Sequence, residues 1–328
     1  MGLNERGYAI AEELIERAGS LGGRLLVRGG VRLLDGGVDA AGSEELGLGM
    51  ARVALGGAGE VSLTPPEGAG AAEAAWPGCP WATVAVRSDD VVAACLASQY
   101  AGWRVADGGF SAMASGPMRA AIGKEDLYET IGLREQPAVS VGLLETAKLP
   151  PDSVCGELAA AAGVAPESLV LLVARTASVA GGVQVVARSL ETAIHKLNDL
   201  GFDLTRIRRG AGTAPLPPVA GDDLTAIGLT NDAVLYGGRV VLEVTGDDES
   251  LAAIGPQAVS RASPAFGAAF RLIFEAAGGD FYAIDPAIFA PARLELVNID
   301  TGARHVFGEL EPATVAESFA AGTATARS

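Results

Sequence analysis

Apolar and polar residues follow two patterns along the chain, one typical of helices and one typical of strands. Residues 1–19 predict an amphipathic helix, because charged side chains are scattered among apolar ones at helical spacing. Residues 24–34 predict two short strands around Gly29-Gly30, and residues 169–175 (LVLLVAR) predict a buried strand. Strands and helices do not alternate regularly, so the pattern favours an α+β fold over a doubly wound sheet.

The remaining elements follow from the same periodicities. The longest helical pattern covers 184–200 and ends at Gly201, whereas 211–218 (AGTAPLPP) predicts a loop. Residues 294–306 predict a hairpin that turns at residues 300–302. Strands are expected at 60–63, 81–87 and 138–144, helices at 89–99, 117–121, 152–162 and 264–277, a strand or hairpin within 233–244, and either state at 46–55.

The chain length and one proline-rich segment suggest a domain boundary. A chain of 328 residues is too long for one small core and suits two domains of roughly 150 residues each. Residues 148–152 contain Pro150-Pro151, which fix an extended conformation. We therefore expect an N-terminal α+β domain at 1–150 and a C-terminal α+β domain at 151–328.

Composition and charge narrow the class of protein. Hydrophobic residues make up 49% and charged residues 20%, as in a folded protein, and no run of about 18 uncharged apolar residues predicts a membrane span. The N-terminus lacks the apolar region of a signal peptide, so we expect a cytoplasmic protein. A net charge of −16 disfavours nucleic-acid binding. An anionic ligand would then require locally clustered cations.

Few residues are available for metal or nucleotide chemistry. Three cysteines lack metal-ligand spacing and there are only two histidines, so a metal site is not expected. The sequence has neither a G-x-G-x-x-G after a strand nor a P-loop, so a nucleotide cofactor is not indicated.

Four short segments could nevertheless carry chemistry. Arg188 and Glu191 share a face of the predicted helix; an exposed ion pair is the ordinary explanation, but the preceding buried strand and Gly-rich connection favour a functional role. Ser115 to Arg119 is a helix start that could bind an anion, with Ser115 as cap and Arg119 as cation. A second helix start of this kind is Thr176 to Ser178, beside Arg175. The stretch Ser98-Gln99-Tyr100 could line a flat ring or form a structural turn, and Asn231 belongs to a probable helix cap.

At these residues the sequence resembles the methenyltetrahydromethanopterin cyclohydrolases. The resemblance covers nearly the whole chain in order. It rests on residues 94–103 (ACLASQYAGW), 111–120 (SAMASGPMRA), 176–203 (TASVAGGVQVVARSLETAIHKLNDLGFD), 210–240 and 281–292 (FYAIDPAIFAPA). Two departures concern substrate contacts: Arg175 stands where proline is expected, and Gly182 stands where serine is expected.

The resemblance implies a fold, a reaction and a set of residues. It implies two α+β domains with mixed sheets and the substrate cleft between them, a homo-oligomer (trimer favoured), and no tightly bound cofactor or metal. The reaction is hydrolysis of 5,10-methenyl-tetrahydromethanopterin to the 5-formyl compound, with Arg188 and Glu191 as catalytic residues. Substrate contacts are expected from Ser98, Gln99, Tyr100, Ser115, Arg119, Arg175, Thr176, Ser178 and Asn231.

Two other functions and one metabolic setting are compatible with the residues. The chain could act on methenyl-tetrahydrofolate, although such enzymes usually carry a dinucleotide fingerprint, or it could be a non-catalytic pterin-binding protein. The Ala/Gly/Arg-rich composition suggests a GC-rich bacterial genome and thus formaldehyde oxidation in a methylotroph-like metabolism.

Overall fold

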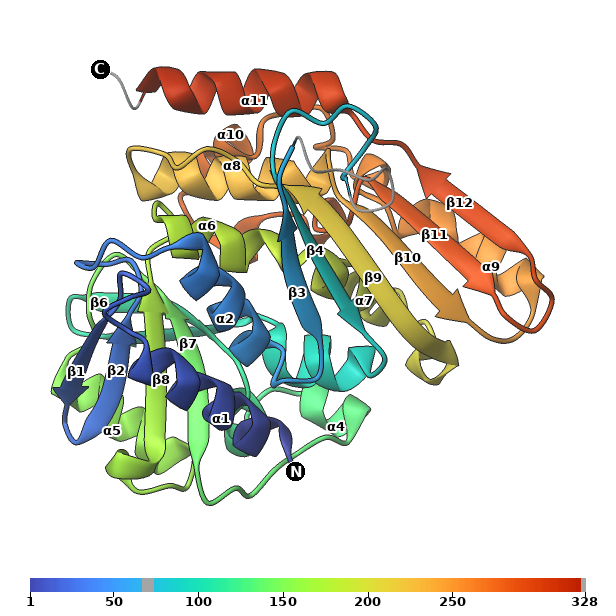
Figure 1. Ribbon diagram of the computed structural model, residues 1–328. Coiled ribbons are helices and arrows are strands. Elements are labelled where there is room, and N and C mark those ends of the chain that lie inside the picture. Colours follow the sequence, from blue (N-terminus) through green and yellow to red (C-terminus); the bar gives the residue numbers. More distant parts are fainter. Residues whose placement is uncertain (67–73, 326–328) are drawn as a thin grey trace. The chain divides into compact units, whose positions relative to one another are not determined.

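The computed structural model describes residues 1–66 and 74–325 and divides into two compact units (Figure 1). The first unit contains residues 1–60 and 92–185, and the second contains 61–91 and 186–328. Each unit is built on its own six-stranded sheet of mixed direction with packed helices, which confirms the α+β class. The boundary predicted after residue 150 lies within the first unit, between a strand and a helix of that unit.

The sheet of the first unit has the order β1-β2-β8-β7-β6-β5. Its three middle strands β2, β8 and β7 run parallel, and β1, β6 and β5 are paired antiparallel at the sides. The bounds are β1 Arg24–Arg28, β2 Val31–Asp35, β5 Trp103–Asp107, β6 Phe110–Ser115, β7 Ser140–Glu145 and β8 Leu169–Ala174. All six residues of β8 are buried, which explains its uninterrupted apolar sequence.

Helices cover both faces of this sheet. Val170 and Leu172 of β8 share a core cluster with α1 (Leu3–Glu16) and α2 (Glu44–Ala54). Of residues 46–55, which the sequence left open between helix and strand, 46–54 are helical. Leu171 and Val173 point to the opposite face, where α5 (Asp152–Ala161) packs. Successive side chains of a strand point to opposite faces, so β8 contributes to two cores. The unit therefore has three layers, with α1 and α2 on one face of the sheet and α5 on the other (Figure 1).

The predicted helix at 89–99 is a π-helix, η1, at Val92–Gln99. The N–H of Tyr100 donates to the carbonyl of Cys95, five residues earlier, as this wider helix requires. The other short helices of the unit are α3 Met118–Ile122, α4 Leu127–Ile131, η2 Pro166–Ser168 and α6 Val179–Val186.

The sheet of the second unit has the order β12-β11-β10-β9-β4-β3. Strands β10 and β11 are parallel, whereas β4–β9, β9–β10 and β11–β12 are antiparallel pairs. The bounds are β3 Glu60–Thr64, β4 Thr83–Ser88, β9 Ile207–Pro215, β10 Arg239–Val244, β11 Arg293–Asn298 and β12 Arg304–Gly308. The β11–β12 pair confirms the hairpin predicted at 294–306.

The helices of the second unit are α7 Ser189–Asp199, α8 Asp223–Leu235, α9 Asp248–Ile254, α10 Phe270–Ala276 and α11 Pro312–Thr325, with 3-10 turns η3 Leu204–Arg206, η4 Gly255–Gln257, η5 Ser260–Ala262, η6 Phe281–Ala283 and η7 Pro286–Ile288. Helices α8, α10 and α11 meet at Asp232, a buried residue of α8. Its carboxylate accepts the Phe270 N–H at 2.9 Å and the Ser318 hydroxyl at 2.6 Å. No helix within 1–66 and 74–325 is long and apolar enough to cross a membrane.

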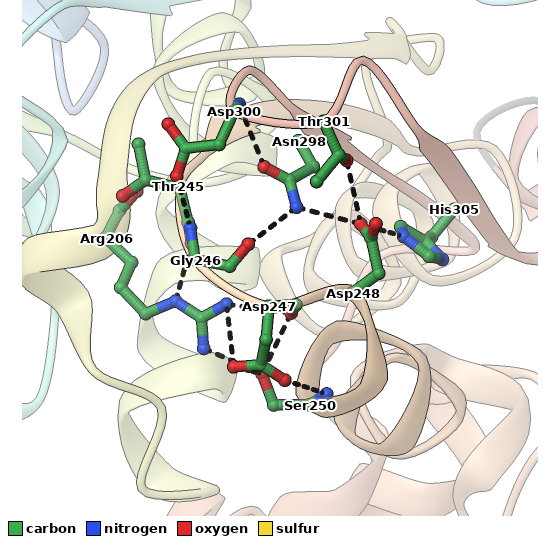
Figure 2. A network of polar contacts seen from close by, with 10 residues as sticks. All are labelled: Arg206, Thr245, Gly246, Asp247, Asp248, Ser250, Asn298, Asp300, Thr301 and His305. Carbon is green, nitrogen blue, oxygen red and sulfur yellow. Dashed lines mark hydrogen bonds and ion pairs between the residues drawn. The ribbon is translucent and has the colours of Figure 1, made fainter.

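A polar network closes the ends of β10 and β11 (Figure 2). Asn298, the last residue of β11, donates to the Gly246 carbonyl and to Asp248, each at 2.8 Å. Asp248 also contacts the His305 ring at 2.8 Å, and Asp300 accepts the Gly246 N–H. These side chains satisfy one another, so the network holds two turns and a hairpin together.

Several predicted elements were wrong in their extent. The helix predicted at 184–200 is two helices, because α6 ends at Val186 and α7 begins at Ser189. Leu190 of α7 packs on Gly210 of β9, where a Cβ would meet the leucine side chain at 2.7 Å. This contact ties α7 to the second sheet, whereas the apolar pattern alone continues through the break.

Two predicted irregular segments belong to regular elements. Residues 211–215 are not a loop but the second half of β9, whose small residues lie against α7. Residues 230–232 lie inside α8, which is capped instead by Asp222 through the Thr225 N–H. The predicted helix at 264–277 shortens to α10, and 233–244 contains the end of α8 and then β10.

Candidate functional site

Three parallel strands of the first unit end at one edge of its sheet: β2 at Asp35, β8 at Ala174 and β7 at Glu145. Ligands bind beyond the carboxyl ends of the strands in open sheets of this kind. The segment predicted from Arg175 to Ser178 leaves β8 at this edge and leads directly into α6.

Asp35 organises the loop that follows β2. Its fully buried carboxylate accepts the backbone N–H groups of residues 37–40 at distances of 2.8 to 3.1 Å. Gly37 of this loop lies against Ser178, since a Cβ at Gly37 would meet the Ser178 hydroxyl at 2.2 Å. The loop can therefore approach the start of α6 only with glycine at this position.

Ser178 caps α6, as the sequence predicted for the start at 176–178. Its hydroxyl accepts the Gly181 N–H at 3.0 Å and donates to the Arg175 carbonyl at 2.8 Å. A Cβ at Gly182 would meet nothing within 4 Å, so the serine expected there would fit without displacing a neighbour. Packing therefore does not require glycine at position 182 of α6.

Glu145 contacts a predicted site residue at this edge, and the sequence analysis did not single it out. The Thr176 hydroxyl donates to one of its carboxylate oxygens at 2.5 Å, and the Gln184 amide donates to the other at 3.5 Å. The available signal was its position immediately after the apolar run of a predicted strand. Together, Glu145, Thr176 and Gln184 form a connected polar group at the carboxyl edge of the parallel strands.

Ser98, Gln99 and Tyr100 lie at the end of η1. The Ser98 hydroxyl is buried and donates to the Ala54 carbonyl at 2.6 Å, so it fastens η1 to the end of α2. The Gln99 side chain is also buried, whereas Tyr100 is partly exposed. Among these three, Tyr100 is best placed to offer a flat surface to a ring.

Arg119 does not act as the available cation that the sequence suggested. Its side chain is only 1% exposed and binds both carboxylate oxygens of Glu125, at 2.7 and 3.0 Å. Ser115 is likewise not the cap of α3, because it is the last residue of β6, and Pro117 occupies the cap position. The guanidinium is therefore charge-matched and engaged in the interior of the first unit.

Arg188 and Glu191 lie at the start of α7 in the second unit. Arg188 is the residue that precedes the helix, and its carbonyl accepts the Thr192 N–H at 2.9 Å. Glu191 is in the first turn, where the helix dipole favours a carboxylate. Both side chains are largely buried, with exposures of 9% and 6%, which contradicts the explanation as an exposed ion pair.

Comparisons with known proteins give the family. The sequence profile described as Cyclohydrolase (MCH) matches residues 2–319. The chain belongs to this family. Its relatives include proteins named methenyltetrahydromethanopterin cyclohydrolase from Methylobacterium organophilum, 43% identical over 97% of both chains, and from Rhodopirellula baltica, 40% identical over 88% of this chain and 86% of the relative. The Methanosarcina barkeri relative is 36% identical over 97% of this chain and 98% of its own.

Membership of the cyclohydrolase family confirms the resemblance found in the sequence and places the chain among hydrolases that act on C–N bonds. Among the residues that the structure describes, no three or more His, Cys, Asp or Glu side chains are grouped so that they could bind a metal ion.

Asn231 is the predicted site residue that fits a ligand-binding role least. It lies in the interior of α8, and its amide donates to the Ile227 carbonyl one turn earlier at 2.8 Å. The structure places the other predicted residues in three regions: Thr176, which contacts Glu145, and Ser178 in the turn that leads into α6; Ser98 and Tyr100 beside Arg119; and Arg188 and Glu191 at the start of α7.

Proposed function

We propose that this chain hydrolyses 5,10-methenyl-tetrahydromethanopterin to 5-formyl-tetrahydromethanopterin. The observation that carries the proposal is the match to the cyclohydrolase family over residues 2–319, together with relatives of that name aligned over 97% of the chain. The buried Arg188 and Glu191 at one helix start supply the chemistry that this reaction needs.

The reacting carbon of the substrate lies between two nitrogens in an amidinium-like cation. It is already electrophilic, and the step that needs assistance is the attack of water, which must lose a proton. Glu191 accepts this proton as the C–O bond forms, and returns it to N10 as the C–N10 bond breaks. Water supplies the oxygen of the formyl group. One of its protons ends on N10, and the other leaves the hydroxyl of the tetrahedral intermediate as the C=O forms and is released to solvent, which removes the positive charge of the substrate.

Arg188 gives Glu191 its orientation and favours the developing hydroxide. A cation near a carboxylate stabilises its charged form, which weakens it as a base but keeps it ready to accept a proton. A carboxylate alone would stabilise the cationic substrate and so slow the reaction, whereas a pair of opposite charges avoids that penalty.

Substrate contacts come from the other candidate residues. Tyr100 and Gln99 suit the pterin ring, since a flat apolar wall and an amide match its faces and edges. Arg175 remains the candidate cation for the anionic tail, because the charge of Arg119 is neutralised by Glu125. Thr176 and Ser178 frame the turn that carries Arg175.

The test is the loss of methenyl-tetrahydromethanopterin absorbance on addition of purified protein. We expect rapid turnover, and a fall of about 10²-fold or more in Glu191→Gln, because the general base is lost while the shape is kept. Glu157→Gln is the matched control, since it makes the same change at an exposed position of α5 and should leave turnover unchanged.

Methenyl-tetrahydrofolate is run beside it to separate the alternatives. Turnover of the folate compound alone would replace the proposed substrate, and tight binding of the methanopterin compound without turnover would indicate a pterin-binding protein. Near-normal turnover in Glu191→Gln would refute the role of this residue.

The wider setting is part of the same proposal. We propose a cytoplasmic homo-oligomer, most simply a trimer, without a tightly bound cofactor, working in formaldehyde oxidation. Identity is 43% to the Methylobacterium organophilum relative and 36% to the Methanosarcina barkeri relative, which supports grouping the chain with the former.

A further inference from the structure

The π-helix η1 ends in a way that needs external support. The last carbonyls of any helix lack partners within it, and buried ones must be satisfied from elsewhere. The carbonyls of residues 96–98 face this problem, since Leu96, Ala97 and Ser98 are all fully buried. A π-helix is also a rare conformation that occurs frequently at functional sites.

Three side-chain or backbone donors satisfy these carbonyls. Arg119 donates through Nη1 to Leu96 at 2.9 Å and to Ser98 at 3.3 Å. The Tyr128 hydroxyl donates to Ala97 at 2.7 Å, and the Gly116 N–H donates to Ser98 at 2.8 Å. A cation at the carboxyl end of a helix is also favoured by the helix dipole.

Arg119 reaches beyond the carbonyls to Tyr100. Its guanidinium lies 5.0 Å from the centre of the Tyr100 ring and 5.5 Å from that of Tyr128, which are cation–π distances. The Tyr100 ring also packs closely on Gly102, since a Cβ at Gly102 would lie 2.2 Å from a ring carbon. The orientation of Tyr100 therefore depends on Arg119 and on the absence of a side chain at 102.

Glu125 fixes Arg119 itself. The bidentate contact matches the planar fork of the guanidinium, which lysine cannot reproduce. The Arg119 side chain is fully buried, whereas that of Glu125 is 23% exposed, and burying a charged guanidinium is costly even beside a carboxylate. We therefore attribute to the Arg119–Glu125 pair a role in fixing the conformation at the end of η1.

We propose that Arg119 is a positioning residue for substrate binding, which acts by holding the end of η1 and the Tyr100 ring in the orientation that receives the pterin. The inference rests on the proposed function, but its structural half, the ordering of residues 98–100 by Arg119, can be measured without turnover.

The experiment compares Arg119→Lys with wild-type protein in two measurements. Hydrogen exchange should be faster at the amides of Tyr100 and Gly116 in the variant, because their bonds to Cys95 and Ser98 depend on the fixed end of η1. With methenyl-tetrahydromethanopterin, KM should rise about 10-fold while kcat stays within about twofold, since binding is weakened and the water-activating residues are untouched.

A merely structural role would give a different result. Partial unfolding lowers the active fraction and hence the apparent kcat, but it leaves KM unchanged. Arg17→Lys is the matched control, because Arg17 is also on the first unit and pairs with Glu45 at an exposed position; it should change neither measurement. Gly102→Ala, which crowds the Tyr100 ring without touching Arg119, should reproduce the rise in KM.

Each outcome decides one part of the inference. Unchanged exchange at Tyr100 and Gly116 overturns the positioning role, and faster exchange with unchanged KM shows that these residues do not contact the substrate, which overturns its functional half. If wild-type protein does not turn over the substrate at all, the proposed function fails, and faster exchange in Arg119→Lys would still establish the ordering.

Discussion

At the scale of single residues, burial changes the chemistry of Asp232 most clearly. Burial raises the pKa of this carboxyl to about 6, although hydrogen bonds from Ser318 and from the Phe270 N–H oppose the rise. A carboxyl whose pKa is higher in the folded state than in the unfolded state stabilises the fold at low pH, and that stability is lost as the pH rises toward 6.

Asp232→Asn should therefore stabilise the protein at neutral and alkaline pH. Relative to wild type, the gain should grow by about 1 kcal/mol between pH 5 and pH 8, because the neutral amide removes the charge that wild type must bury. Urea unfolding midpoints at the two pH values measure it. Asp222→Asn is the control: hydrogen bonds from Thr225 lower the pKa of Asp222, so its variant should not gain stability as the pH rises.

At this scale the sequence predicted residue types better than residue roles. The capping position predicted for Ser178 is confirmed, whereas the catalytic roles of Arg188 and Glu191, predicted from their spacing and the resemblance, remain predictions. For Arg119 and Asn231 the sequence could not show the partners, Glu125 and the Ile227 carbonyl, because a charge or an amide in a sequence carries no sign of what it binds. Glu145 was not singled out, because its contact with Thr176 joins the end of β7 to the turn that follows β8.

At the scale of elements, the start of α7 depends on a glycine in β9. A Cβ at Gly212 would lie 2.7 Å from the Leu190 backbone nitrogen and from the Ser189 hydroxyl. Backbone cannot yield as a flexible side chain does, so a larger residue at 212 must move α7 relative to its sheet. The prediction of one helix at 184–200 did not include the break before Ser189. Apolar periodicity shows which residues share a helix face, but it does not show the strand on which the helix packs.

Gly212→Ala should therefore reduce both stability and turnover. We expect a loss of about 1 to 3 kcal/mol from overpacking and a fall in kcat of about tenfold or more, since a small displacement of a catalytic group is costly. Thermal unfolding and steady-state kinetics measure the two effects. Gly156→Ala in α5 is the matched control, because its Cβ meets open space; a tolerated Gly212→Ala would show that α7 is not held by this contact.

At the scale of the whole molecule, the two units are interleaved in sequence. The first unit takes β1 and β2 from before residue 60 and β7 and β8 from after residue 92. Strand β8 lies between β2 and β7, and it is buried over all six residues. Local patterns located these strands well, but parallel pairing of strands more than a hundred residues apart leaves no mark in a single sequence.

A fragment of residues 1–150 should therefore fail to fold alone. Without β8, strands β2 and β7 lose their shared neighbour, and two apolar cores lose Leu169 to Val173. In contrast, 1–60 joined by a flexible linker to 92–185 retains all six strands of the sheet and should fold. Cooperative thermal unfolding followed by far-ultraviolet circular dichroism distinguishes them. A cooperative transition for 1–150, and none for the joined fragment, would show that the chain folds as two contiguous halves. A cooperative transition for the joined fragment alone would show that the first unit needs β8, which follows residue 150 in the sequence.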